Sequence, residues 1–224
     1  MRVLAIETST SQAGVALIED GQLVLERASA RPKQSAERLL PLIAEVLAEA
    51  GWQASTLHRL GVSIGPGSFT GLRVGIACAQ GLSLGLGIPL VGVTSLQAMA
   101  RGVPESIPGL RVPLLDARRA EVFAGAYDAG PRAAERLAPL AVAAELARDR
   151  LLAQLPAPLV FIGSGLGLCG IAPDFSGPKA DEPSAFAVGL LAEELDPREH
   201  PPVPVYVRDA GATLPDLGTP TVAE

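Results

Sequence analysis

The stretch GPGSFTGLRVG, residues 65–75, decides the fold of this chain together with the residues on either side of it. A short apolar run, GVSI at 61–64, leads into the glycine-rich turn, and a helical pattern continues from the turn to about residue 86. The run IPLVGV at 88–93 then predicts another buried strand. Strand, glycine turn, helix and strand in this order place backbone N–H groups at a helix N-terminus, where a phosphate can bind.

The side chains that act on a phosphate are missing from this turn. No Gly-Lys-Ser/Thr follows Gly67, which excludes a P-loop, and the third glycine of a dinucleotide-binding fingerprint is absent at the required offset. Two interpretations stay open, a purely structural tight turn and a nucleotide-facing loop. The candidate residues of such a loop are Thr8, Ser9, Gly65, Gly67 and Ser68.

The residues around the turn predict one α/β unit. Strands are expected at 3–9, 15–19 and 22–29, and Asp20-Gly21 is a strong hairpin signal between the second and the third. Further strands are expected at 60–64 and 88–93, and helices at 35–50, 69–86 and 95–100. The order β-β-β-α-β-α-β-α is typical of a ribonuclease-H-like unit, a mixed sheet with helices on its faces. The apolar stripe expected for the first helix is Leu39, Leu40, Ile43, Val46 and Leu47.

The second half of the chain partly repeats this pattern. The proline-containing loop at 102–109 is a candidate domain boundary. Beyond it, RVPLLDA and EVFAGAY predict strands, 142–155 a helix, 159–163 a strand and 184–195 a last helix. We therefore expect two unequal ribonuclease-H-like lobes, at 1–101 and 110–207, followed by a flexible tail at 208–224.

Composition narrows the function classes. The formal net charge is -6, which argues against independent nucleic-acid binding, since that normally shows a basic footprint. Cys78 and Cys169 lie in apolar surroundings, and two buried thiols in a reducing cytoplasm are a simpler interpretation than a redox pair. The chain runs from Met1 straight into a strand pattern, so no signal peptide is expected. We expect a cytoplasmic protein.

A membrane span is the alternative for one segment. No charged residue occurs between Arg73 and Arg101, a stretch long enough to cross a bilayer. Gln80, Ser83, Pro89 and many glycines interrupt it, however. A buried helix followed by a buried strand explains the stretch better, so no membrane partner is expected.

Small residues recur along the helix expected at 69–86. They fall on two lines, one of Gly71, Gly75 and Ala79 and the other of Ala77, Gly81 and Gly85. Each glycine inside a helix costs about 0.5–1 kcal/mol relative to alanine, so such a helix is usually kept for close approach of another backbone. That backbone belongs either to the sheet beneath the helix or to a second protein chain, and the spacing alone does not choose between them.

The chain is poor in catalytic groups. Glu7 ends the first strand, where sugar-kinase-like and actin-like folds place an acid that helps to handle metal and phosphate, but a polar strand end is the simpler interpretation. Asp116, Arg118 and Arg119 fit an acid with an anion clamp or a turn with solvated arginines, and the second is favoured. No Cys/His cluster has metal-ligand spacing, and no nucleophile-elbow motif is present.

Several segments together resemble the TsaB (also called YeaZ) family. They are VLAIETST, SAERLLPLI, GPGSFTGLRVGIACAQGLSLGLGIPLVGVTSL, DARRAEVFAGAY and PVYVR, which run over nearly the whole chain. The resemblance implies the fold of the actin-like ATPase (ASKHA) superfamily. It also implies a non-catalytic subunit of the bacterial machinery that makes threonylcarbamoyladenosine (t6A) in transfer RNA. A catalytic relative, TsaD, carries two metal-binding histidines where this chain has Ser95 and Met99, neither of which suits such a metal.

The resemblance also implies partners. A chain of this family pairs with a TsaD-type catalytic subunit, which carries the metal, and forms a similar homodimer when alone. The complex recruits a TsaE-type ATPase and modifies N6 of adenosine 37 in transfer RNAs that read codons starting with A. Transfer RNA is reached only through the complex, and a nucleotide at the shared interface stays open. No catalytic or metal-binding residue is assigned. The interface residues are expected to be Glu37, Leu40, Arg73, Gly75, Ala77, Gly81 and Gly85.

Two other functions stay open. One is an independent enzyme of the same superfamily, either a metal-dependent acyl or phosphoryl transferase or a peptidase, which would need a metal site or a nucleophile. The other is a regulatory homodimer outside any enzymatic complex. ATP turnover by the isolated chain would favour the first, and a dimer that persists beside the catalytic subunit would favour the second.

Overall fold

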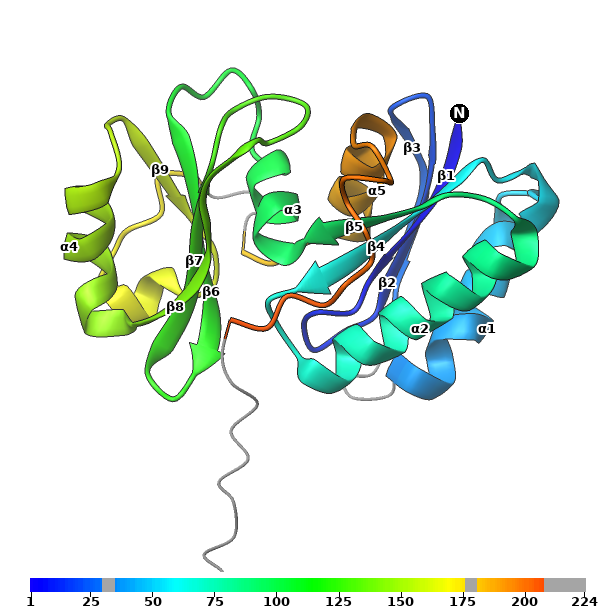
Figure 1. Cartoon of the computed structure of the whole chain (residues 1–224), viewed down its shortest axis with the longest axis horizontal. Coiled ribbons are helices and arrows are strands. Elements are labelled where there is room, and N and C mark those ends of the chain that lie inside the picture. Colours follow the sequence, from blue (N-terminus) through cyan, green and yellow to red (C-terminus); the bar gives the residue numbers. More distant parts are fainter. Residues whose placement is uncertain (30–34, 176–180, 208–224) are drawn as a thin grey trace, which may run out of the picture.

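The computed structural model describes residues 1–29, 35–175 and 181–207, and within them the side chains of residues 35–37 are not described. The tail predicted at 208–224 lies outside the described residues. Two lobes, each built on one β-sheet, stand side by side (Figure 1).

The first sheet has the strand order β3-β2-β1-β4-β5. Strand β1 is antiparallel to β2 and parallel to β4, and β4 is parallel to β5. The ribonuclease-H-like order predicted from the sequence is therefore confirmed. The strands are β1 (Arg2–Glu7), β2 (Gly14–Glu19), β3 (Gln22–Ala28), β4 (Arg59–Gly65) and β5 (Leu90–Thr94).

The second sheet repeats the first in shortened form. Its order is β8-β7-β6-β9, and β6 pairs antiparallel with β7 and parallel with β9, as β1 does with β2 and β4. The prediction of two unequal copies is confirmed. Strand β8 falls mostly outside the predicted elements, because it is alanine-rich, contains Pro139 and has a single buried residue, so that pairing with β7 defines it. The strands are β6 (Leu110–Arg118), β7 (Glu121–Tyr127), β8 (Glu135–Ala143) and β9 (Leu159–Ile162).

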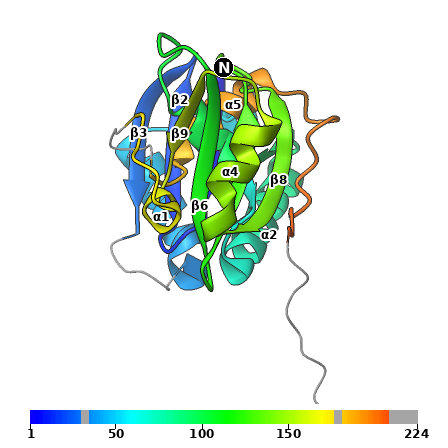
Figure 2. The same ribbon diagram turned by 90° about the vertical axis from the view of Figure 1, so that its left-hand side faces the viewer.

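The helices and sheets form five layers. Helices α1 (Ser35–Glu49) and α2 (Phe69–Leu86) cover the outer face of the first sheet, and α3 (Ser95–Arg101) and α5 (Ala185–Glu194) lie between the sheets (Figure 1). Helix α4 (Ala144–Gln154) crosses the outer face of the second sheet (Figure 2). Short 3₁₀ turns occur at Ala54–Thr56 and Leu166–Cys169.

Helix α5 corrects the expected domain boundary. The sequence placed residues 110–207 in the second lobe, but α5 packs on β1, β2 and β4 of the first. Its packing is close, because a Cβ at Gly189 would overlap the Ile18 side chain and a Cβ at Gly61 would lie 2.7 Å from Ala192 Cβ. The following segment also belongs to the first sheet, since Val205 N–H donates to Ile64 O at 2.8 Å. Hydrophobic periodicity shows that a helix is buried, not which sheet covers it.

Buried apolar residues form three layers. In β1, Leu4 and Ile6 face α1 and α2, whereas Val3 and Ala5 face the middle layer around α3 and α5. The middle layer continues into the second sheet, and a third layer lies between that sheet and α4. The stripe expected for α1 is wrong in one respect, because Leu40 is exposed; the buried residues of that helix are Leu39, Leu42, Ile43 and Val46.

Candidate functional site

The inner face of α2 explains one line of glycines. A Cβ at Gly71 would overlap the Thr8 carbonyl oxygen, and a Cβ at Gly75 would overlap Thr8 Oγ1. The helix therefore lies directly on the turn that follows β1. Gly75, expected at a partner interface, is buried against the chain's own turn, which corrects that assignment.

The five residues of the candidate nucleotide loop pack mainly against one another and the rest of the chain. Ser68 N–H donates to Ser9 O at 2.7 Å, and Ser68 Oγ accepts from Gly71 N–H at 3.3 Å, so Ser68 caps the helix. A Cβ at Gly67 would overlap Ser9 O, and Gly65 adopts φ +98° against the Leu72 side chain. Because the chain itself fills this loop, the residues do not fit a phosphate cradle.

Apart from Tyr206, which contacts its N-terminal end, no described residue covers the outer face of α2. Arg73 is the one charged residue of this helix, and Leu84 is 87% exposed. A Cβ at Gly81 or Gly85 would meet nothing within 4 Å, so these glycines are not needed for packing inside the chain. The exposed residues are Phe69, Thr70, Arg73, Ala77, Gln80, Gly81, Leu84 and Gly85.

Helix α1 lies beside α2 and adds Leu40, whose exposed fraction is 59% (Figure 1). We call these exposed residues of α2, together with Leu40, the outer helix face. The side chain of Glu37, also expected at the interface, lies outside the described side chains.

Three side chains meet at the N-terminal end of the outer helix face. The Arg73 guanidinium lies over the Phe69 ring, 3.8 Å from its centroid, and the Phe69 and Tyr206 rings are 5.3 Å apart. Arg73 Nε donates to Tyr206 Oη at 3.3 Å. The contact ties the segment after α5 to α2. Sequence reasoning missed Phe69 and Tyr206, although both lie in motifs that carried the resemblance.

Among the described residues, α2 is also the one helix with the length and composition of a membrane span, which for a single helix is weak evidence. Its inner face packs on β4 and on the turn after β1. This arrangement fits a surface helix of a folded domain.

Glu7 lies at the end of β1 and is only 3% exposed. Glu7 Oε1 accepts hydrogen bonds from the backbone N–H and the hydroxyl of Ser9, while none of the described residues supplies a partner for Oε2. Burial raises the pKa of Glu7 to about 7, while the hydrogen bonds from Ser9 and the nearby Ser63 hydroxyl, which is itself 3.0 Å from Ser95 Oγ, oppose the shift. The negative charge of Glu182 adds to it.

The region between the lobes is packed where α3 begins. Ser95 Oγ lies 3.0 Å from Ser63 Oγ, and Met99 is fully buried in the middle layer. Hydrogen bonds from Thr94 and Gln97 join β5 and α3 to the second lobe. Thr94 Oγ1 lies 3.2 Å from Tyr127 Oη, and Gln97 Nε2 donates to the Arg132 carbonyl at 2.9 Å.

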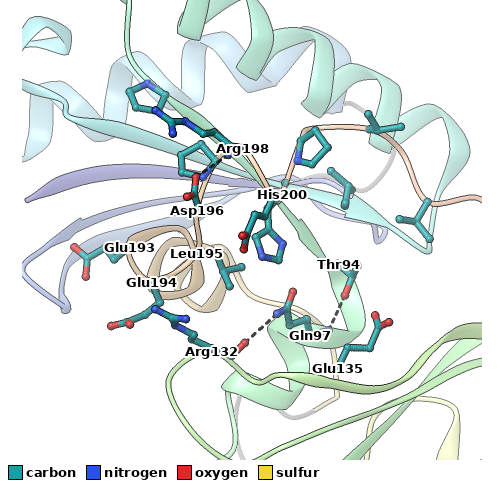
Figure 3. Close-up of a pocket in the computed structure, with 18 of the residues that line it drawn as sticks. Thr94, Gln97, Arg132, Glu135, Glu193, Glu194, Leu195, Asp196, Arg198 and His200 are labelled. Atoms are coloured by element: carbon teal, nitrogen blue, oxygen red, sulfur yellow. Dashed lines mark hydrogen bonds between the residues drawn. The ribbon is translucent and has the colours of Figure 1, made fainter.

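Two of the open cavities that the described residues form carry more acidic than basic side chains. The larger, about 1440 Å³, lies between the C-terminal end of α5 and residues 132–135 (Figure 3). Arg59, Arg132 and Arg198 face a larger set of acids there, namely Glu135, Glu193, Glu194, Asp196 and Glu199. The smaller, about 400 Å³, adjoins the end of β1 and is lined by Glu7, Glu26, Asp181 and Glu182 with Arg27. Neither lining suits a polyphosphate.

The other candidate groups are scattered. His58 Nδ1 accepts from Arg2 N–H at 3.0 Å, whereas His200 lines the larger cavity. Asp116 Oδ1 accepts from Arg118 N–H at 2.7 Å at the tip of the β6–β7 hairpin, which fits a turn with solvated arginines. Within residues 1–29, 35–175 and 181–207, no group of three or more His, Cys, Asp or Glu side chains could hold a metal ion.

Comparison with known proteins gives the family. The model of the tRNA N6-adenosine threonylcarbamoyltransferase (TsaD) family matches residues 27–155, more than half of the chain. The chain is 40% identical over 128 residues to the tRNA threonylcarbamoyladenosine biosynthesis protein TsaB of Escherichia coli, covering 57% of this chain and 55% of that protein. It is 34% identical over 127 residues to TsaB of Bacillus subtilis, with the same coverage.

YeaZ from Pseudomonas aeruginosa, a solved structure, superposes with a TM-score of 0.72 at 27% identity, over 92% of this chain and 99% of that one. The chain belongs to the TsaD family, in its TsaB/YeaZ branch. Its alignments span only about half the length of the two curated TsaB relatives.

The TsaB/YeaZ fold, with two lobes built on mixed sheets and covered by helices, is the fold class expected from the sequence. Component A of (R)-2-hydroxyglutaryl-CoA dehydratase from Acidaminococcus fermentans shares the fold, with a TM-score of 0.55 at 10% identity over 87% of this chain and 98% of that one. Ser95 and Met99, which the sequence resemblance pairs with two metal-binding histidines of TsaD, are both wholly buried.

Proposed function

We propose that this chain is an accessory subunit of t6A biosynthesis that binds and activates a TsaD-type catalytic subunit in the cytoplasm. The catalytic subunit transfers the threonylcarbamoyl group to N6 of adenosine 37 in transfer RNAs that read codons starting with A. The outer helix face carries the proposal, since it is apolar, nearly uncharged and uncovered by the described parts of the chain. The TsaB names of the relatives supply the pathway.

The chemistry of the outer helix face fits a helical partner. Ala77, Gly81 and Gly85 leave a shallow track along α2, which lets a second helix approach closely. Leu84 on the same helix and Leu40 on the neighbouring α1 are exposed and can serve as apolar contacts. Arg73 contacts Phe69 and Tyr206 at one end of the face. Most of the face can therefore lose its water on docking without burying an unpaired charge.

The interior supports an accessory role over an independent transferase. Ser63, Ser95 and Met99 occupy the packed junction of the lobes, and the glycine loop is filled by Thr8 and Ser9. In this proposal the metal resides in the catalytic partner, and transfer RNA is contacted only through the complex. A TsaE-type ATPase joins the complex, and the same outer helix face forms a homodimer when the chain is alone. A nucleotide bound near the shared interface would need groups from the partner.

The test is transfer RNA modification in vitro with the catalytic subunit, the small ATPase and threonylcarbamoyl-adenylate, with and without this chain. We expect modification to depend on this chain, and the chain alone to modify nothing. Equal rates without it would overturn the proposal. ATP turnover or modification by the chain alone would instead favour the independent enzyme.

A matched pair of variants tests the surface. Leu84→Asp places a charge in the outer helix face and should weaken binding to the catalytic subunit by at least tenfold, because the carboxylate must lose its water on docking. Leu146→Asp makes the same change at another exposed leucine, on α4 of the second lobe, and should bind normally. Equal binding by both variants would place the interface elsewhere.

A further inference from the structure

The turn after β1 connects a buried carboxyl group to the outer helix face. Glu7 Oε1 accepts from Ser9 N–H and Ser9 Oγ, and Ser9 O in turn accepts from Ser68 N–H, the cap residue of α2. One side chain therefore fixes the turn, and the turn is hydrogen-bonded to the residue that caps the helix.

Contact between the turn and α2 leaves no free space. At Gly67, Gly71 and Gly75 even a methyl group would overlap Thr8 or Ser9. A displacement of the turn must therefore be followed by a displacement of the helix, since close-packed elements do not absorb strain independently. The opposite face of the same helix is the outer helix face.

The two oxygens of Glu7 have different surroundings. Oε1 has two donors, whereas Oε2 and the nearby Thr8 Oγ1 are buried without a hydrogen-bond partner among the described residues. A charge on a buried oxygen without a partner is costly, and moving the turn toward water would relieve that cost. A protonated carboxyl keeps both Ser9 hydrogen bonds without this penalty.

We infer that Glu7 is a positioning residue for α2. Its carboxyl group does not touch the partner, but it determines the position of the outer helix face through the Thr8–Ser9 turn. The neutral carboxyl holds the turn, and therefore the helix, more firmly than the charged one. The inference rests on the proposed docking function for its consequence, but its structural part concerns this chain alone.

Other charged groups lie near Glu7, and a test of its ionisation must distinguish their effects. Glu182, ahead of α5, disfavours its ionisation, and Glu26, Arg27 and Asp181 line the adjoining small cavity. On the turn, β4 and α3, the neighbours are the uncharged Ser9, Ser63 and Ser95. His58 lies next to Arg2 at the other end of β1, and His200 lines the larger cavity.

The first experiment follows hydrogen exchange of the full chain between pH 6 and pH 8, expressed as protection factors. If opening of α2 exposes Glu7 to water, protection of the α2 amides should fall about tenfold over this range, since the folded and open states bind the proton differently. The amides of α4, in the other lobe, are the internal control and should keep constant protection.

Variants separate positioning from mere packing. Glu7→Gln keeps an acceptor for Ser9 but cannot ionise, so its α2 protection should be independent of pH. Glu182→Gln removes a nearby negative charge and should shift the midpoint of the step to lower pH. A step that persists unchanged in Glu7→Gln, or a flat profile in the wild-type chain, would overturn the inference.

A second experiment links the step to docking. Between pH 6 and pH 8, the affinity of the wild-type chain for the catalytic subunit should fall relative to that of Glu7→Gln. Comparing the two proteins removes any pH dependence that comes from the partner itself. If neither the wild-type chain nor Glu7→Gln binds the catalytic subunit, the proposed function is wrong. The hydrogen-exchange experiment still tests the positioning role of Glu7 in that case. Binding with identical pH profiles for the two proteins would show that Glu7 does not act on docking.

Discussion

Glu7 lies in surroundings that stabilise its neutral form over its charged form. Its ordinary pKa is 4.5, and in the folded chain burial raises the pKa to about 7. The stabilisation that the folded state gains by holding this proton is fully present below pH 4.5 and is lost as the pH rises through 7. Above pH 7 both the folded and the unfolded chain carry the charge, and the fold bears the whole cost of burying it.

Glu7→Gln should therefore stabilise the chain in a pH-dependent way. The pKa shift corresponds to about 3 kcal/mol, so at pH 8 we expect the free energy of unfolding to rise by about 1–3 kcal/mol, less whatever the new amide loses in hydrogen bonding. At pH 4.5 the gain should vanish. Urea unfolding at the two pH values measures this, and an equal effect at both would mean that the carboxyl does not titrate as described.

At the scale of elements, α2 shows what a sequence can and cannot predict. Its length, its start after the glycine turn and its two lines of small residues follow from the sequence. Glycine destabilises a helix interior, so its recurrence at helical spacing indicates close packing. Which line faces inward does not follow from the sequence, since Gly75 and Gly81 have the same chemistry. The structure distinguishes them only through Thr8, which lies 67 residues before Gly75 in the chain.

The same limit explains the other corrections. Leu40 and Leu42 of α1 are the same residue type two positions apart, and only the position of the sheet decides that the second is buried. Helix α5 lies within the helix predicted at 184–195, yet it packs on the sheet of the other lobe because Gly61 and Gly189 let it fit there. Glu7 could be located as a strand-end acid, but its burial depends on what packs around it. Local sequence patterns determine where helices and strands form, whereas contacts with residues distant in the chain determine which of their faces is buried.

The two glycines of α2 provide a paired prediction. Gly81→Ala should raise the free energy of unfolding by about 0.5–1 kcal/mol, because the site is open and alanine favours the helix. Gly75→Ala should lower it by about 1–3 kcal/mol, because the new methyl group overlaps Thr8 Oγ1. Thermal unfolding followed by circular dichroism compares the two. The two substitutions must change the free energy of unfolding in opposite directions. A Gly75→Ala variant with unchanged stability would contradict the packing of α2 on the turn.

At the scale of the whole molecule, the two lobes share one apolar layer. The cluster around α3 and α5 includes Val3 and Val91 of the first sheet and Phe123 and Ile162 of the second. Thr94 and Tyr127 add a hydrogen bond across the junction, where burial raises the pKa of the Tyr127 hydroxyl. The lobes are therefore packed as one unit at this junction, although each sheet repeats the same topology.

Residues 1–101 expressed alone should therefore fail to fold cooperatively, although they contain all five strands of the first sheet. Without α5, the Val3 and Ala5 face of β1 loses its cover, and α3 loses its contacts in the second lobe. The full chain should unfold in a single calorimetric transition whose calorimetric and van't Hoff enthalpies agree. Residues 1–101 should bind a hydrophobic dye and show no sharp transition. Two separate transitions in the full chain, or cooperative unfolding of the fragment, would mean that the shared layer does not join the lobes energetically.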